Sequence, residues 1–177
     1  MDQALKLLFS RRKVGKRVRA LARELNAVYG RGPVTALCVL KGAVFFYADL
    51  VRLLDAQVAV EFARASSYGD DTESCGAVDL DMAGQEAFAG KRVLVVEDIV
   101  DTGLTLAVIL DRLRELGAAE VRVCALVDKT GRRQVEVPVH HAGFRIERGF
   151  VVGCGMDHAG RFRTVGGLYE IVDSSAQ

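Results

Sequence analysis

The sequence contains no tryptophan, only two prolines and four cysteines in 177 residues, and its net charge is only +1. Cys38, Cys75, Cys124 and Cys154 lie far apart and form no CxxC pair, which favours free thiols over disulfides or a zinc site. No apolar run approaches the roughly 18 residues of a membrane span, and the N-terminus has no apolar segment typical of a signal peptide. The near-zero charge gives no overall attraction to nucleic acids. We therefore expect a soluble cytoplasmic protein.

Half of the residues are apolar and 27% are charged, a composition typical of a globular chain rather than a disordered one. A chain of this length buries roughly 70% of its unfolded surface on folding. We expect one domain that spans residues 1–177.

Apolar residues recur at three- and four-residue spacing between Val14 and Val28, which predicts an amphipathic helix. Ser10 is suited to begin this helix and Gly30 to end it. The opposite face is strongly basic. We interpret it as a solvated face, with an RNA- or partner-binding surface as the alternative.

Short apolar runs predict strands at 34–40, 58–62, 92–96, 121–127, 150–152 and 168–172, with a further short strand at 77–82 after a polar loop at 66–76. Helices are expected at 43–54 and from 106 to 116, where Gly117 ends the second one. The alternation of strands and helices predicts an α/β fold with a parallel, doubly wound sheet. Because the 43–54 helix is apolar nearly all round, it indicates deep burial or an oligomer interface.

The strongest chemical pattern follows the apolar run 93–96. Glu97 and Asp98 are expected at the carboxyl end of a central strand, the edge at which parallel sheets bind ligands. The segment DTGLT at 101–105 then turns into a helix, whose backbone N–H groups suit a phosphate. Carboxylates would repel a bare phosphate. Carboxylates and a phosphate-binding segment can serve the same ligand if it carries a phosphate at one end and, in its middle, hydroxyls and a divalent ion that contact the carboxylates.

The segment VLVVEDIVDTGLT at 93–105 resembles the phosphoribosyl-pyrophosphate signature of the type I phosphoribosyltransferases, and its acids and DTG are similar to the hypoxanthine-guanine branch. Further matches occur in the same order along the chain at Leu40-Lys41-Gly42, Ser67-Tyr68, Lys129, Phe150-Val151-Val152-Gly153, Asp157 and Arg163. The resemblance implies a central parallel sheet flanked by helices, a small hood region and a mobile active-site loop. It also implies a purine salvage enzyme that transfers the phosphoribosyl group from phosphoribosyl pyrophosphate to hypoxanthine or guanine, with Mg²⁺, giving IMP or GMP and pyrophosphate.

By this resemblance, Asp101 acts as general base or acid beside the imidazole nitrogen of the purine. Glu97 and Asp98 hold the ribose hydroxyls, directly or through metal-bound water. The ribose phosphate is bound by Thr102, Gly103, Leu104 and Thr105. An aliphatic residue at Leu104 is harmless if the main-chain N–H groups make the contact.

The resemblance also implies the remaining site residues. The pyrophosphate is bound by Lys41, Gly42 and Arg163, and in the family a cis peptide precedes the lysine. The purine is bound by Lys129, Phe150, Val151 and Asp157, the metal by Glu97, Asp98 and Asp157, and the lid contains Ser67 and Tyr68. Among these, Lys129 selects a carbonyl at the purine six position, because an amino group there would leave a buried charge unpaired.

Some features depart from this pattern or leave alternatives open. Cys154 and His158 stand where many relatives carry tyrosine, and Asp128 either pairs with Lys129 or faces solvent, so the choice among hypoxanthine, guanine and xanthine stays open. A homodimer or homotetramer is expected. The alternative function is a regulator of the same fold that binds RNA through the basic helix.

Two further motifs are interpreted as decoys. Gly153, Gly155 and Gly160 have the wrong spacing for a dinucleotide site, and no helix pattern follows them. His140-His141 lacks a third metal ligand at suitable spacing, so we expect a surface loop there.

Overall fold

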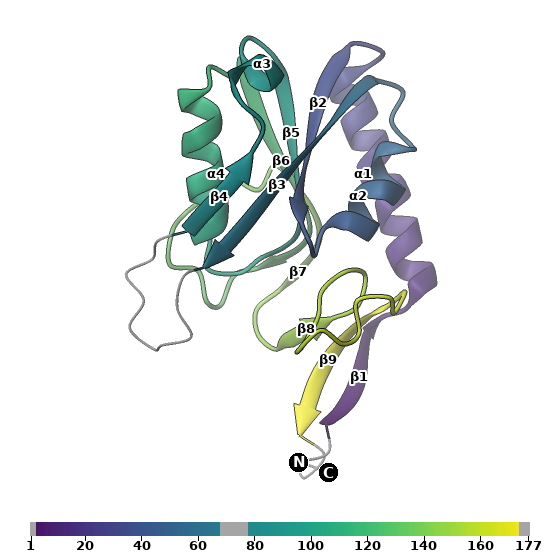
Figure 1. Cartoon of the computed structure of the whole chain (residues 1–177). Helices are drawn as coiled ribbons and strands as arrows, with labels where there is room; N and C mark the ends of the chain where they lie inside the picture. The colour runs from purple at the N-terminus through teal and green to yellow at the C-terminus, as the bar shows by residue number, and fades with distance from the viewer. Residues whose placement is uncertain (1–2, 68–77, 174–177) are drawn as a thin grey trace.

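The structure is a computed structural model that describes residues 3–67 and 78–173. Its elements are β1 (Gln3–Phe9), α1 (Arg11–Tyr29), β2 (Pro33–Leu40), α2 (Val44–Val51), β3 (Gln57–Ser67), β4 (Val78–Met82), α3 (Gln85–Phe88), β5 (Arg92–Val100), α4 (Leu104–Glu115), β6 (Glu120–Lys129), β7 (His141–Ile146), β8 (Phe150–Val152) and β9 (Leu168–Asp173). Six strands form one sheet in the order β4-β3-β2-β5-β6-β7, and three form a second in the order β1-β9-β8 (Figure 1).

In the larger sheet, every neighbouring pair is parallel except β3 and β4. This arrangement confirms the α/β prediction, and the antiparallel β4 confirms the short strand expected after the polar loop. The smaller, antiparallel sheet lies beyond one end of the larger one (Figure 1) and corresponds to the expected hood. The mobile loop expected at 66–76 lies mostly outside the described residues.

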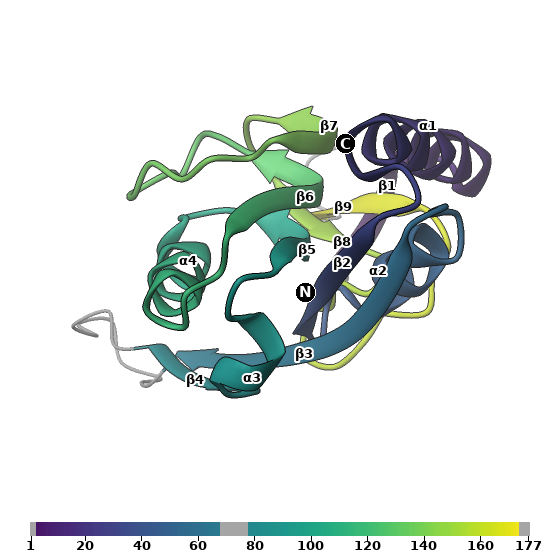
Figure 2. The same cartoon turned by 90° about the horizontal axis from the view of Figure 1, so that it is seen from above.

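Two apolar cores cover the two faces of the larger sheet. Figure 2 shows α1 and α2 on one side of it and α4 on the other. Strand β2 illustrates why both faces are buried, since Ala36 and Cys38 belong to the core under α1 and α2, whereas Leu37 and Val39 belong to the other. Successive side chains of a strand point to opposite faces, so a continuous apolar run fills both cores.

Helix α1 confirms the boundaries expected from its sequence. The Ser10 side chain accepts a hydrogen bond from Lys13 N at 3.4 Å, and Gly30, at φ 56°, follows the last helical residue. The buried residues of the helix include Val14, Val18 and the others of the predicted stripe up to Leu25. Within the described residues, no helix is long and apolar enough to cross a membrane.

Several elements differ from the sequence expectations. Helix α2 ends at Val51, earlier than expected, and β5 continues to Val100. The prediction of a surface loop at His140-His141 is wrong for His141. This residue begins β7, and its Nδ1 lies 3.1 Å from Glu24 Oε2. Strand β7 was missed because its pairing with β6 is decided by tertiary contacts and not by an apolar run. Strand β1 was missed for the same reason, since it pairs with β9 from the far end of the chain.

Candidate active site

The candidate site is built around the junction between β5 and α4. Glu97 and Asp98 lie near the carboxyl end of β5, two to three residues before its end at Val100, and Gly103, at φ 88°, precedes the first residue of the helix. A Cβ atom at Gly103 would lie 2.3 Å from Val135 O. Both the positive φ and this close approach therefore require glycine.

The predicted phosphate-binding segment surrounds a small hollow at this junction. The hollow has a volume of about 100 Å³ and is lined by Glu97, Ile99, Val100, Asp101, Thr102, Gly103, Thr105 and Leu106. The N–H group of Leu104 is directed to Thr102 Oγ1 at 3.4 Å. The structure thus brings five of the predicted site residues, with the backbone of Leu104, around one helix N-terminus.

Glu97 and Asp98 are acids in an unfavourable environment. Glu97 is 8% exposed, and its Oε2 has no hydrogen-bond partner among the described residues. Burial and the neighbouring charge of Asp98 raise the pKa of Glu97 well above its usual range. Burial also raises the pKa of Asp98 to about 6, against the hydrogen bond from Ile99 N and the charge of Arg163, which lower it. Hydroxyl donors or a hard cation would relieve this environment.

Three segments meet at Gly42, which lies two residues after the end of β2 at Leu40. The peptide bond between Leu40 and Lys41 is cis, as the family resemblance implied. A Cβ atom at Gly42 would lie 1.8 Å from Asp98 Oδ2, and one at Gly155 would lie 1.7 Å from Gly42 O. Glycine at both positions therefore allows the β2 end, the β5 end and the loop after β8 to touch.

A larger cavity of about 320 Å³ opens beside this meeting point. It is lined by Gly42, Asp98, Ile99, Asp101, Lys129, Arg132, Phe150, Val151, Met156, Asp157 and Arg163. Eight of these residues were predicted to bind parts of one substrate pair. The side chain of Lys41 is exposed and does not line the cavity, so the structure does not bring Lys41 together with Arg163.

At one end of the cavity, Lys129 and Asp101 form an ion pair. Lys129 is 5% exposed and its Nζ lies 3.1 Å from Asp101 Oδ2, while the exposed Arg132 lies at 3.7 Å from the same oxygen. Asp101 Oδ1 is buried without a hydrogen-bond partner in the described part of the chain. A buried lysine and a carboxylate with a free oxygen can together donate to and accept from one heterocycle.

The aromatic residue predicted to stack on a base lies at the rim of the same cavity. Phe150 is 49% exposed and meets the His158 ring edge-on, with the centroids 5.1 Å apart. Val151 is buried. On the other side, Arg163 pairs with Asp157 at 2.6 Å and donates to Gly155 O at 2.7 Å.

The sequence left the role of Asp128 open and missed Arg133. Asp128 does not pair with Lys129; it accepts from Arg133 Nη2 at 2.6 Å and lies 3.5 Å from Arg145. Arg133 also donates to Val100 O at 3.3 Å. The next two residues donate their N–H groups to Thr102 O at 2.9 and 3.0 Å. Arg133 therefore fixes the segment that covers the β5–α4 junction, and only the basic pair 132–133 hinted at it in the sequence.

The described part of the predicted lid lies at the end of β3, and the glycine motif follows the end of β8. Tyr68 lies outside the described residues, and Ser67 ends β3. Gly153 and Gly155 lie in the loop after β8 with positive φ, and no helix follows them among the described residues. No group of three His, Cys, Asp or Glu side chains that could hold a metal occurs in the described residues.

A family model described as phosphoribosyl transferase domain matches residues 6–159 of this chain. The chain belongs to the phosphoribosyltransferase family. Its relatives include the hypoxanthine-guanine-xanthine phosphoribosyltransferase of Tritrichomonas foetus, 37% identical over 93% of this chain and 90% of the relative. The hypoxanthine phosphoribosyltransferase of Haemophilus influenzae is 38% identical over 94% of both chains.

Solved structures extend the similarity from sequence to fold. A hypoxanthine-guanine phosphoribosyltransferase from Bacillus anthracis has a TM-score of 0.87 at 32% identity, covering 97% of this phosphoribosyltransferase and 100% of that chain. A hypoxanthine phosphoribosyltransferase from Staphylococcus aureus has a TM-score of 0.88 at 27% identity, covering 97% and 94% of the two chains. The type I phosphoribosyltransferase fold expected from the sequence is thus confirmed.

Proposed function

We propose that this phosphoribosyltransferase transfers the phosphoribosyl group of phosphoribosyl pyrophosphate to a 6-oxopurine, hypoxanthine or guanine, in cytoplasmic purine salvage. The observation that carries the proposal is the buried Lys129–Asp101 pair in the cavity that also contains Asp98 and Arg163. The names of the relatives support it. The bond between the anomeric carbon and pyrophosphate breaks, and a bond from that carbon to a purine nitrogen forms.

The ribose phosphate is proposed to bind at the β5–α4 junction. Main-chain N–H groups around Gly103 and the hydroxyls of Thr102 and Thr105 would donate to its oxygens. Leu104 would contribute its backbone. Glu97 and Asp98 would accept hydrogen bonds from the ribose hydroxyls, which provides the donors that these buried carboxylates lack.

The purine is proposed to bind at the other end of the cavity. Asp101, whose Oδ1 has no hydrogen-bond partner among the described residues, would take or give the proton at the imidazole nitrogen. Lys129 would donate to the carbonyl at position six, in exchange for part of its contact with Asp101. Phe150 would stack on the ring, and the Val151 main chain would bind its edge.

The leaving pyrophosphate is proposed to bind between Gly42 and Arg163. Arg163 would release Asp157 in part and use its guanidinium for the phosphate oxygens. Lys41 would turn toward the same anion from the solvent side. Ser67 and Tyr68 would belong to a lid that excludes water from the reacting carbon.

The carboxylates of the site suit a magnesium ion that takes most of its ligands from substrate and water, since the described residues contain no group of three His, Cys, Asp or Glu side chains that would hold a metal alone. Glu97 Oε2 is buried without a hydrogen-bond partner among the described residues. Burial raises the pKa values of Glu97 and Asp98, so a cation beside them would stabilise their charged forms. Carboxylate oxygens suit Mg²⁺, which takes most of its ligands from substrate phosphates and water. Glu97, Asp98 and Asp157 would hold the ion, directly or through water. When bound, it would neutralise charge on the leaving pyrophosphate.

A homodimer or homotetramer is proposed on the basis of exposed apolar side chains on α2 and β3. Phe45 of α2 and Val60 and Phe62 of β3 are each 45–49% exposed, and the Phe62 ring lies 6.1 Å from that of Tyr47 on α2. Burying these side chains against a second copy would remove apolar area from water. Sedimentation of the purified protein should give a mass above that of one chain.

Nucleotide formation from hypoxanthine, guanine, xanthine and adenine, each with phosphoribosyl pyrophosphate and Mg²⁺, tests the proposal. We expect turnover with at least one oxopurine, no comparable rate with adenine, and loss of the rate when a chelator removes the metal. Turnover of adenine alone would contradict the proposal. RNA retention on a filter without turnover of any purine would support the regulator instead, although Arg17 of the basic helix is engaged internally with Gly143 O at 2.9 Å.

A further inference from the structure

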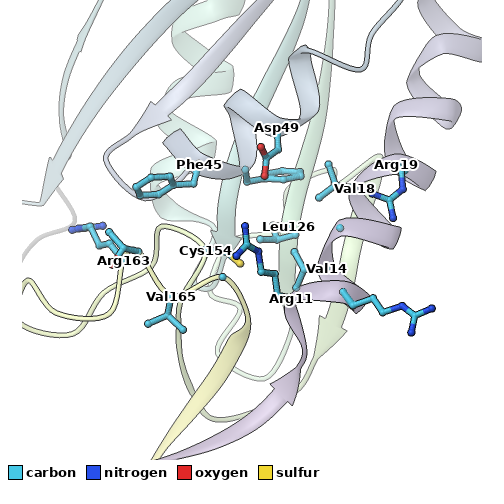
Figure 3. Close-up of a pocket in the computed structure, with 15 residues that line it drawn as sticks. Arg11, Val14, Val18, Arg19, Phe45, Asp49, Leu126, Cys154, Arg163 and Val165 are labelled. Atoms are coloured by element: carbon cyan, nitrogen blue, oxygen red, sulfur yellow. The ribbon is translucent and has the colours of Figure 1, made fainter.

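A second cavity lies between α1, α2 and the loop after β8, on the other side of that loop from the proposed purine site. Its volume is about 720 Å³, compared with about 320 Å³ for the candidate active site. Figure 3 shows the side chains that line it. Among its lining residues, the transfer proposed above uses only Arg163, and Phe45 is also one of the exposed side chains proposed to meet a second copy.

The floor of this cavity is apolar and comes from three elements. Val14 and Val18 of α1, Phe46 of α2 and Leu126 of β6 line it, and each is at most 7% exposed. Cys154 adds a thiol whose pKa is raised to about 11, mainly by burial, so it remains protonated and behaves as a small apolar group. Such a floor suits the aromatic or aliphatic body of a ligand.

The rim of the cavity is positively charged. Arg11, Arg12 and Arg19 line it, and no ion-pair partner is found for these three among residues 3–67 and 78–173. The lining carboxylate, Asp49, already pairs with Arg52 at 2.7 Å. Figure 3 shows the Arg11 side chain extending from the start of α1 toward Cys154. The positive charge of these three arginines therefore favours binding of an anion at the mouth of the cavity.

The fold does not explain why glycine stands at position 15, but its lack of a side chain leaves the cavity open. It lies inside α1 and lines the cavity, and glycine there costs about 1 kcal/mol relative to alanine. No positive φ requires it, and an added Cβ would meet only the flexible end of Arg19 at 3.6 Å. A larger side chain would fit the helix but would fill the space in the cavity.

The cavity shares a wall with the candidate active site. Arg163 lines both cavities. In the same loop, Cys154 N donates to Val165 O at 2.7 Å and Gly155 N donates to Arg163 O at 2.9 Å. A ligand that shifts Cys154 or Val165 would therefore move Arg163 relative to Gly42.

We propose that this cavity binds a small amphipathic anion, with its apolar body on the Val14–Val18–Phe46 floor and its acidic group at Arg11. Binding there changes the affinity for phosphoribosyl pyrophosphate through Arg163; this second part rests on the proposed function. The acidic group is a carboxylate, sulfonate or phosphate, which share the chemistry that an arginine recognises.

Binding is tested with 8-anilinonaphthalene-1-sulfonate, whose fluorescence rises in apolar sites, and with the uncharged N-phenyl-1-naphthylamine. We expect saturable binding of the sulfonate, and about tenfold weaker binding of the uncharged probe, the equivalent of one charge-assisted contact. Gly15→Leu should abolish binding, whereas Ala27→Leu on the exposed side of α1 should not. Arg11→Gln should weaken the sulfonate severalfold, whereas Arg23→Gln should leave it unchanged.

Unaltered binding by Gly15→Leu would overturn the site, and equal binding of the two probes would overturn its preference for anions. Folding does not confound the test, because both Gly15→Leu and removal of a positive charge at the start of a helix should keep or raise the thermal midpoint.

Coupling is tested by steady-state kinetics with the sulfonate present. The KM for phosphoribosyl pyrophosphate should change at least about twofold in the wild type and not in Gly15→Leu, which is a small coupling free energy. An unchanged KM in the wild type would overturn the coupling. Failure of the proposed function is distinguishable, since it would leave probe binding intact while no purine is turned over.

Discussion

The two ends of the candidate active site are the proposed ribose end, at Glu97 and Asp98, and the proposed base end, at Asp101 and Lys129, and they differ in how their charges are balanced. At the ribose end, the buried Glu97 and Asp98 have raised pKa values and Glu97 Oε2 lacks a partner among the described residues. At the base end, Asp101 pairs with the buried Lys129. The ribose end is therefore stabilised by a ligand that brings donors or a cation, whereas the base end must exchange an internal contact for ligand atoms. This difference separates changes that affect stability from changes that affect selectivity.

The largest effect is expected when the acid of the base end is neutralised. Asp101→Asn removes the proposed general acid or base, and turnover should fall by about 10²–10⁴-fold. The KM for phosphoribosyl pyrophosphate should change far less, because the ribose end is intact. Steady-state kinetics measures both. Asp111→Asn, on the exposed face of α4, is the matched control, and unchanged turnover in Asp101→Asn would remove Asp101 from its role.

The next effect concerns selectivity. Lys129→Ala removes the donor proposed for the six-position carbonyl, and it should lower the ratio of kcat/KM for hypoxanthine over adenine by about 10–100-fold. The absolute rate should also fall, since Asp101 loses its counter-charge, so the ratio is the informative readout. A ratio equal to that of the wild type would mean that Lys129 does not read the base.

At the ribose end, a substitution should stabilise the free protein. The pKa of Asp98 is raised to about 6, so its ionisation costs stability as the pH rises from about 4 to about 6, and the full cost persists above that range. Asp98→Asn should raise the free energy of unfolding at pH 7.5 by about 1–3 kcal/mol. The gain should vanish near pH 4.

Urea unfolding at the two pH values measures this gain, and a loss of stability at pH 7.5 would contradict the assignment. The same variant should bind phosphoribosyl pyrophosphate more weakly, as expected for a site that trades stability for ligand binding.

The smallest effect is expected at Leu104. If the phosphate is bound by main-chain N–H groups, Leu104→Ala should keep the KM for phosphoribosyl pyrophosphate within about twofold. Gly103→Ala should raise it strongly, because a Cβ there would lie 2.3 Å from Val135 O. A strong effect of Leu104→Ala would show that this side chain takes part in binding.

The sequence was sufficient for the parts of the fold that are determined locally. The stripe from Val14 to Leu25 and the cap at Ser10 fix α1, and the alternation within β2 fills both cores. The β5–α4 junction was predictable because its acids and Gly103 are contiguous in the chain. Strands β1 and β7 were not, since their partners are chosen by contacts that the local pattern does not encode.

The same limit applies to the site. Lys129 and Asp101 were each predicted, but their mutual ion pair depends on the register between β5 and β6. Arg133 was missed because its role depends on contacts with Asp128 and Val100 O, which form only when the chain is folded. Lys41 was expected beside Arg163, yet the exposed side chain of Lys41 does not line the cavity that contains Arg163.

One ligand should bridge the two ends of this site, and a crystal structure with bound IMP shows directly whether it does. We predict the phosphate at the N–H groups of residues 102–105, the ribose hydroxyls at Glu97 and Asp98, and the six-position oxygen within hydrogen-bond distance of Lys129 Nζ. IMP bound elsewhere, for example in the cavity between α1 and α2, with this site empty, would contradict the account.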